Sequence, residues 1–275
     1  MLYLTDLDFT LLRSDATLSA YTQQVWNEAV DAGVRLSVAT ARSLTGVREL
    51  LAPLRLHHPL ILLDGTLIVA PDGTILDLSV LERPLTEAIL AAADAMGHRP
   101  LIVALDAEGN ERFYYPPAPN ACQQRLIATM HNRRRILGGE AYRAPSRTLK
   151  MVFMDEEAPM RALEAALKER WGDVLETKRA HDGYLDCWFL TLLHPHGDKA
   201  HALARLEQLA DAPPSETTVF GDSHNDLGMF EVAGYSVAVA NAIDALKARA
   251  DRVLEHTNDE DAVARFLYEE AIMRN

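Results

Sequence analysis

Along the first 65 residues, short apolar runs alternate with segments in which apolar residues recur every three or four positions. The runs at 2–5, 34–40 and 59–65 predict strands, and residues 18–35 and 44–56 have the spacing of amphipathic helices. The strands are almost uniformly apolar rather than alternating, which is typical of a parallel sheet that is covered on both faces. The pattern therefore predicts a doubly wound α/β fold.

The pattern changes in the middle of the chain. A Pro-Asp-Gly turn at 71–73 and a Glu-Gly-Asn turn at 108–110 each separate two short apolar runs, which predicts two hairpins. A helix is expected near 119–136, and paired strands precede His194, after which the alternation of helix and strand returns. The expected architecture is a Rossmann-like, doubly wound parallel-sheet core at residues 1–79 and 191–275, with an inserted α+β domain at 80–190.

The composition limits the partners. The 275 residues carry a formal net charge of −13, whereas a nucleic-acid partner needs a basic surface, so none is expected. The basic run at Arg133 to Arg135 is interpreted as solvated surface. An anionic substrate would need local cations or a metal ion to offset the overall field. The sequence leaves a monomer and a homodimer both open.

The two cysteines, Cys122 and Cys187, stand in no metal-ligand spacing, and we expect them to be free thiols in a reducing compartment. No apolar run approaches the roughly 20 residues that a membrane helix needs. A predicted strand begins at Leu2 with no basic segment ahead of it, which is unlike a signal peptide. A cytoplasmic protein with no membrane partner is therefore expected.

Polar residues follow several predicted strands of the core. Asp6 and Asp8 follow the first strand, Thr40 ends the second, and Asp222 follows a strand at 216–221. The carboxyl ends of parallel strands meet at one edge of a sheet, so we expect these side chains to converge. Buried carboxylates are unfavourable unless charge or hydrogen bonds compensate them, and Mg²⁺ prefers oxygen ligands. The sequence therefore predicts a Mg²⁺ site at this edge.

Such a site is suited to phosphate chemistry. Asp6 could attack phosphorus and form an aspartyl-phosphate. Asp8 points to the same side and could protonate the leaving oxygen, then take a proton from the attacking water. The hydroxyl of Thr40 and the ammonium of Lys199, at a helix start, could bind the phosphoryl oxygens.

Four segments resemble the motifs of the haloacid dehalogenase-like phosphatases. "DLDFTLL" at 6–12 resembles the first motif and "ATARS" at 39–43 the second. "HGDKAHAL" at 196–203 resembles the third and "GDSHNDLGMF" at 221–230 the fourth. The tail "TNDEDAVARFL" at 257–267 is similar to that of the Cof-type branch. The motifs occur in the family's order and cover nearly all of the predicted core segments.

The resemblance implies a role for each matching residue. Asp6 is expected to be the nucleophile and a metal ligand, and Asp8 the general acid and base, which would bind the metal through its backbone carbonyl. Asp222 would complete the protein ligands, and Asp226 would support them or bind the metal through a water molecule. The implied phosphate contacts are the side chains of Thr40, Lys199 and Asn225 and the backbone N–H groups of Leu7 and Ala41. The insert at 80–190 would be a C2-type cap that contacts substrate and excludes water.

Two residues depart from the family pattern. Ala41 replaces the usual glycine, which is tolerated if its φ is negative. Asp64 replaces an asparagine and is either a turn residue or a contact for a substrate hydroxyl or amine. The expected function is a Mg²⁺-dependent phosphatase of small phosphorylated metabolites, such as a sugar phosphate or nucleotide. The alternatives are a phosphomutase or phosphotransferase with the same intermediate, and a non-catalytic phosphate- or metal-binding regulator.

Overall fold

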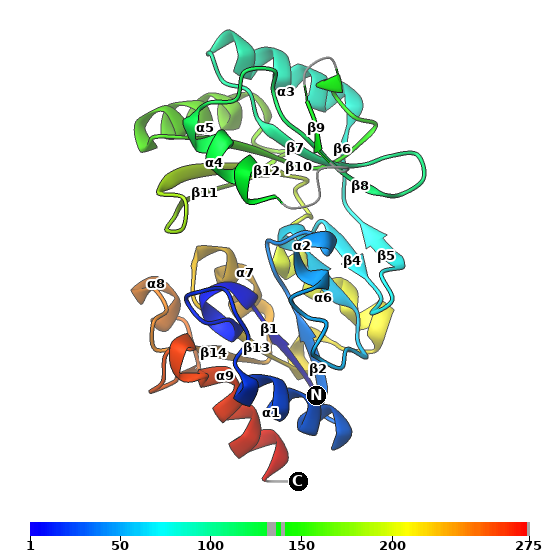
Figure 1. Ribbon diagram of the computed structural model, residues 1–275, viewed down its shortest axis with the longest axis vertical. Helices are drawn as coiled ribbons and strands as arrows, with labels where there is room; N and C mark the ends of the chain where they lie inside the picture. The colour runs from blue at the N-terminus through cyan, green and yellow to red at the C-terminus, as the bar shows by residue number, and fades with distance from the viewer. Residues whose placement is uncertain (131–135, 139–140, 274–275) are drawn as a thin grey trace. The chain divides into compact units, whose positions relative to one another are not determined.

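The computed structural model describes residues 1–130, 136–138 and 141–273 (Figure 1). The chain divides into two compact units: Met1–Leu78 with Asp198–Asn275, here called the core unit, and Ser79–Gly197, here called the inserted unit. The predicted boundary at 190/191 falls inside a strand, β12 (Cys187–Leu193), because the apolar run continues to the end of that strand. The structure divides the chain there at 197/198 instead.

The core unit is built on a parallel sheet, which confirms the predicted fold class. Its strands have the order β15-β14-β13-β1-β2, so β1, the first strand of the chain, lies inside the sheet between β13 and β2 (Figure 1). A single parallel bridge from Ala39 to Ile61 continues the sheet to β3, which begins a three-stranded antiparallel sheet, β3-β4-β5. The strands are β1 (Leu2–Thr5), β2 (Arg35–Val38), β3 (Leu60–Leu62), β4 (Leu67–Val69), β5 (Ile75–Leu78), β13 (Thr217–Gly221), β14 (Tyr235–Ala238) and β15 (Arg252–Val253).

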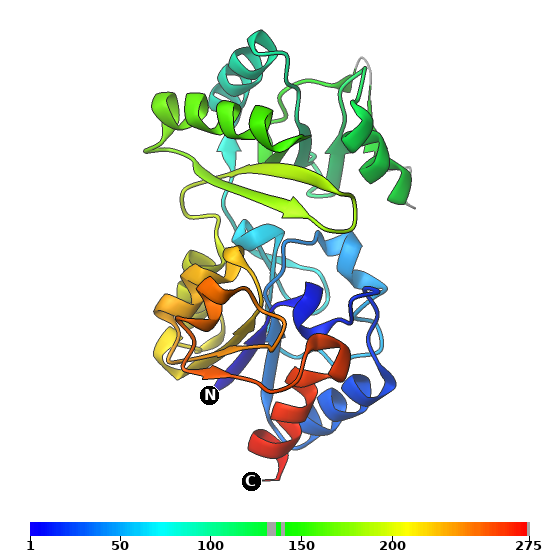
Figure 2. The same cartoon turned by 90° about the vertical axis from the view of Figure 1, so that its left-hand side faces the viewer.

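Helices connect and cover these strands. The C-terminal helix α9 and the helical turns after it pack beside α1, and both views show the red end of the chain next to blue α1 (Figures 1 and 2). The helix α6 packs against α7 and β3. The helices are α1 (Ala20–Asp31), α2 (Leu44–Arg48), α6 (Lys199–Ala210), α7 (Leu227–Val232), α8 (Asp244–Lys247) and α9 (Ala262–Phe266).

The inserted unit is an α+β domain around a seven-stranded sheet. Six of the strands have the order β11-β12-β10-β7-β8-β9, and the seventh, β6, pairs with β10. Alternate residues of β10 point to opposite faces. Met151 and Phe153 pack with α3 and α5, whereas Val152 and Met154 pack with α4. The elements are β6 (Leu81–Glu82), α3 (Arg83–Ala95), β7 (Leu101–Leu105), β8 (Glu111–Tyr114), α4 (Ala121–Thr129), β9 (Ile136–Leu137), β10 (Arg147–Asp155), α5 (Glu157–Trp171), β11 (Glu176–Asp182) and β12.

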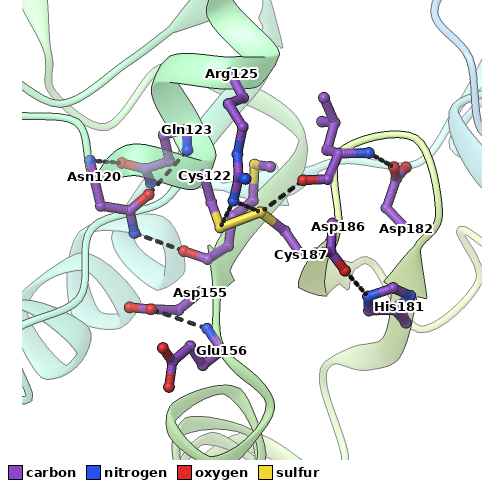
Figure 3. The surroundings of a disulfide bond; sticks show 12 residues. Asn120, Cys122, Gln123, Arg125, Asp155, Glu156, His181, Asp182, Asp186 and Cys187 are labelled. Atoms are coloured by element: carbon purple, nitrogen blue, oxygen red, sulfur yellow. Dashed lines mark hydrogen bonds and ion pairs between the residues drawn. A yellow bond between two sulfur atoms is a disulfide. The ribbon is translucent and has the colours of Figure 1, made fainter.

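The two cysteines form a disulfide, so the prediction of free thiols is wrong (Figure 3). Cys122 lies in the first turn of α4 and Cys187 begins β12, and packing of α4 on that face of the sheet brings their sulfur atoms to 2.15 Å. Arg125 donates hydrogen bonds to both sulfur atoms, at 3.2 and 2.9 Å (Figure 3). The inference from free thiols to a reducing compartment therefore loses its basis.

The predicted helix near 119–136 is shorter than expected, because Ile136 already belongs to β9. The basic run at Arg133 to Arg135 lies outside the described residues. Both predicted hairpins are confirmed, as β4 with β5 and β7 with β8. Within the described ranges, no helix has the length and apolar character to cross a bilayer.

Candidate active site

The first aspartate of the chain lies where β1, an inner strand of the core sheet, ends. β1 pairs with β13 on one side and β2 on the other, and the backbone N–H of Asp6 extends this pairing by donating to the carbonyl of Phe220 at 3.0 Å. Asp6 is 4% exposed. The loops that follow β2 and β13 therefore begin at the same edge of the sheet as the buried carboxylate of Asp6.

Lys199 is completely buried and bridges two carboxylates. Its Nζ donates to Asp6 Oδ1 at 2.5 Å and to Asp226 Oδ1 at 2.6 Å. Lys199 is the first residue of α6, whose start is fixed by Asp198 as N-cap. Burial opposes the charged form of this lysine, but the carboxylates of Asp226 and Asp6 outweigh burial and raise the pKa of Lys199. The ammonium is therefore a permanent positive charge in the site.

The turn after β13 is shaped by Asp226. Its Oδ2 accepts hydrogen bonds from the backbone N–H groups of Asp222 (3.0 Å) and Ser223 (3.1 Å), while Oδ1 accepts from Lys199. A Cβ atom on Gly221 would lie 2.7 Å from the side chain of Asp226. This contact is the physical reason for glycine ahead of the first aspartate of "GDSHND".

Three carboxylates of these loops form one cluster. Among the described residues, Asp6, Asp222 and Asp226 are a group whose oxygen atoms lie within 4.8 Å of one another. Burial and the neighbouring Asp226 raise the pKa of Asp222 to about 7. Burial also raises the pKa of Asp6, against the effect of Lys199. Three crowded carboxylates beside one ammonium fit a hard divalent cation, which takes oxygen ligands and relieves their repulsion.

Asp8 does not join this cluster but forms an ion pair with Arg42. Arg42 Nε donates to Asp8 Oδ2 at 2.8 Å, and its Nη2 donates to Oδ1 at 2.5 Å. Both side chains are 29% exposed. The second aspartate of the first motif is thus partly exposed and paired with Arg42 rather than part of the acidic cluster.

The loop after β2 and the turn after β3 are tied together by backbone hydrogen bonds. Thr40 is fully buried, its carbonyl accepts from Asp64 N–H at 3.0 Å, and its hydroxyl accepts from Arg42 N–H at 3.1 Å. Leu63 N–H donates to the carbonyl of Arg42 at 3.0 Å. Ala41 does not have a positive φ, so its methyl group adds no backbone strain.

Asp64, the second departure, is a buried turn residue with φ 64°. Asp is one of the few residue types that adopt this left-handed conformation readily. Asn225 lies beside it, with its Nδ2 3.5 Å from Asp64 Oδ1. The carboxylate therefore faces the amide that the resemblance assigns to phosphate binding.

The structure thus brings Asp6, Lys199, Asp222 and Asp226 into direct contact or close proximity, and places Thr40 and Asn225 on adjoining loops. Leu7 is buried in the loop directly after Asp6. The sequence interpretation missed two residues. Thr10 Oγ1 donates to Asp222 Oδ1 at 3.0 Å, and Arg42 pairs with Asp8. Both lie inside the quoted motifs "DLDFTLL" and "ATARS", which was the available signal.

Comparison with known proteins gives a consistent result. The sequence model of the haloacid dehalogenase-like hydrolases matches residues 3–267. Over 95% of both chains, the sequence is 28% identical to the 5-amino-6-(5-phospho-D-ribitylamino)uracil phosphatase YwtE of Bacillus subtilis. It is also 28% identical to the HMP-PP phosphatase of Cronobacter sakazakii, over 95% of this chain and 92% of that one. A haloacid dehalogenase-like hydrolase from Bacteroides thetaiotaomicron has a similar fold, with a TM-score of 0.80, 22% identity and 98% of each chain covered.

Proposed function

Because the chain belongs to the haloacid dehalogenase-like hydrolase family, we propose that it is a Mg²⁺-dependent phosphatase of small phosphorylated metabolites. The observation that carries the proposal is the position of Asp6, a buried carboxylate at the end of the inner strand β1, held by Lys199 and crowded by Asp222 and Asp226. Such a carboxylate is fixed and oriented as a nucleophile must be. The relatives are named as phosphatases, one of 5-amino-6-(5-phospho-D-ribitylamino)uracil and one of HMP-PP, and they support the substrate class.

The metal would be held by Asp6 and Asp222, with the backbone carbonyl of Asp8, and Asp226 would support these ligands or bind the metal through a water molecule. When bound, Mg²⁺ would neutralise charge between the Asp6 carboxylate and an incoming phosphoryl group. The protein residues would bind the phosphoryl oxygens through the side chains of Thr40, Lys199 and Asn225 and the backbone N–H groups of Leu7 and Ala41.

In the proposed reaction, a carboxylate oxygen of Asp6 attacks phosphorus, and the bond from phosphorus to the leaving oxygen breaks. Asp8 donates a proton to that oxygen as the alcohol departs. Asp8 then takes a proton from a water molecule that attacks the aspartyl-phosphate, which releases inorganic phosphate and restores Asp6. Residues 79–197 would act as the cap that selects the substrate and excludes water. A cytoplasmic location and a monomeric or homodimeric state stay predictions from the sequence.

The test is a screen of sugar phosphates, nucleotides and p-nitrophenyl phosphate for phosphate release, with Mg²⁺ and with EDTA. We expect phosphate release in Mg²⁺ but not in EDTA. In Asp6→Asn, which keeps the shape of the side chain but not the nucleophile, the rate of release should fall by at least about 10³-fold. Transfer of the phosphoryl group to an added acceptor alcohol, without release of inorganic phosphate, would favour a phosphotransferase or mutase. Binding of substrates without turnover would favour a regulator.

A further inference from the structure

The ion pair between Arg42 and Asp8 joins two loops of the core unit by a forked contact. Both nitrogen atoms of the fork donate, at 2.8 and 2.5 Å, to separate oxygen atoms of the carboxylate. Such a bidentate pair fixes the plane of the carboxylate as well as its distance. An ionised carboxylate has about four acceptor positions. The fork takes one on each oxygen and leaves a second on each for a proton.

Asp8 needs an external support because its own loop provides little. Its backbone is extended (φ −66°, ψ 129°) and is followed by Phe9 at φ 56°, so it lies outside any regular helix. Its side chain is 29% exposed, in contrast to the 6% of Asp6. A half-exposed aspartate without a partner would sample several side-chain rotamers.

Arg42 is a suitable support because its backbone is anchored on both sides. Its N–H donates to the hydroxyl of Thr40 and its carbonyl accepts from Leu63 N–H at 3.0 Å. Leu63 has φ 52°, which is unusual for a bulky residue. The loops that follow β1, β2 and β3 are therefore linked through this one arginine.

We propose that Arg42 is a positioning residue, which orients the Asp8 carboxylate for proton transfer to the leaving oxygen and from the attacking water. The proposal rests on the proposed phosphatase function and adds to it a residue that acts through Asp8. Its consequence is that the loss of rate on removing Arg42 should depend on the leaving group. An alkyl phosphate needs a proton on its leaving oxygen, whereas p-nitrophenolate leaves without one.

The experiment measures leaving-group release in a single turnover with Mg²⁺, for p-nitrophenyl phosphate and for the best sugar phosphate of the parent protein. In Arg42→Met, we expect the release of the sugar to fall by about 10²-fold or more and that of p-nitrophenolate by less than about 5-fold. Arg42→Lys, which keeps the charge but not the fork, should lie between the parent and Arg42→Met. Arg13→Met is the matched control, because it removes another forked Arg–Asp pair of the core unit, with Asp261, and should leave both rates within about 2-fold.

A second comparison shows whether Arg42 acts through Asp8. If it does, Arg42→Met should lower sugar release in the parent but not in an Asp8→Asn background. An equal loss for both leaving groups, or a further loss in the Asp8→Asn background, would overturn the positioning role while the parent activity and its dependence on Asp6 still stand. If the parent itself released neither group, the phosphatase function would fall, and the positioning role with it. A poorly folded Arg42→Met is recognised by its circular dichroism, and Arg42→Lys then gives the same two comparisons.

Discussion

Replacing Lys199 by methionine should destabilise the metal-free core unit strongly and the Mg²⁺-bound unit much less. The ammonium is fully buried and donates to Asp6 and Asp226 at 2.5 and 2.6 Å, so its removal leaves two buried carboxylates without their cation. Methionine keeps the length and apolar stem of the side chain. The change therefore removes the charge with little change in packing.

The magnitude follows from the burial of the pair. Breaking a buried ion pair by removing one partner typically costs about 3–5 kcal/mol, because the remaining charge is uncompensated. Two carboxylates are affected here, which favours the upper part of this range near neutral pH. An ion that binds only the folded protein adds about 2.7 kcal/mol of stability at one hundred times its dissociation constant. Because the variant site is more negative, the ion should bind it more tightly than it binds the parent.

The assay is urea unfolding in EDTA and in Mg²⁺, followed by a tryptophan that reports on the core unit alone. Of the three tryptophans of the chain, Trp26 is buried in the core unit, and its Nε1 donates to the carbonyl of Arg55 at 2.9 Å. Trp171 and Trp188 belong to the inserted unit and can be replaced by phenylalanine. The expected result is a large loss of stability in EDTA that shrinks on addition of Mg²⁺.

A matched control adds Asp226→Asn to Lys199→Met. Because it removes one of the two uncompensated charges, it should recover part of the lost stability in EDTA. A loss below about 1 kcal/mol in EDTA would contradict the assignment of a buried charged pair. Equal stabilisation of parent and variant by Mg²⁺ would show that the ammonium and the metal do not compensate the same carboxylates.

Three further predictions concern other parts of the chain. Gly221→Ala would force a Cβ against Asp226 and should cost about 1–3 kcal/mol of core-unit stability with loss of phosphatase activity, while Gly183→Ala, with open space around it, should be neutral. Cys122→Ser and reduction of the parent should each destabilise the inserted unit by about 4 kcal/mol, because the disulfide joins residues that are 65 positions apart. An unchanged urea midpoint would refute this prediction. In EDTA, the stability of the core unit should decrease as the pH rises from about 4 toward 7, because the folded state raises the pKa of Asp222 to about 7 and so favours its protonated form; a flat profile would contradict the charge crowding.

Much of the core could be predicted from local pattern. Unalternating apolar runs predicted the strands β1, β2 and β3. Asp6 after β1 and Asp222 after β13 were expected to converge, because parallel strands end at one edge of the sheet. The pairing of Lys199 with Asp6 was not visible from spacing, since 193 residues separate them. The resemblance to known motifs, rather than periodicity, brought that lysine into the site.

The remaining features could not be predicted because they depend on contacts between distant segments. Cys122 and Cys187 meet only when α4 packs on the sheet of the inserted unit, and sequence spacing carries no record of that packing. The contact of Arg42 with Asp8 likewise joins two loops whose separation of 34 residues has no periodic meaning. The left-handed turn at Asp64 was within reach, because Asp followed by Gly is a turn signal.

Residues with positive φ flank the fork between Arg42 and Asp8. Phe9 and Leu63 both have positive φ, at 56° and 52°, and such conformations in non-glycine residues cost about 1–3 kcal/mol each. Phe9 directly follows Asp8, and its carbonyl accepts from Asn241 Nδ2 at 2.8 Å, while Leu63 N–H holds the carbonyl of Arg42. Strained backbone is thus maintained at both ends of the Asp8–Arg42 contact. A half-exposed ion pair contributes at most about 1 kcal/mol of stability, too little to retain this strain for stability alone. This strain accords with the proposed role of Arg42 in orienting the Asp8 carboxylate.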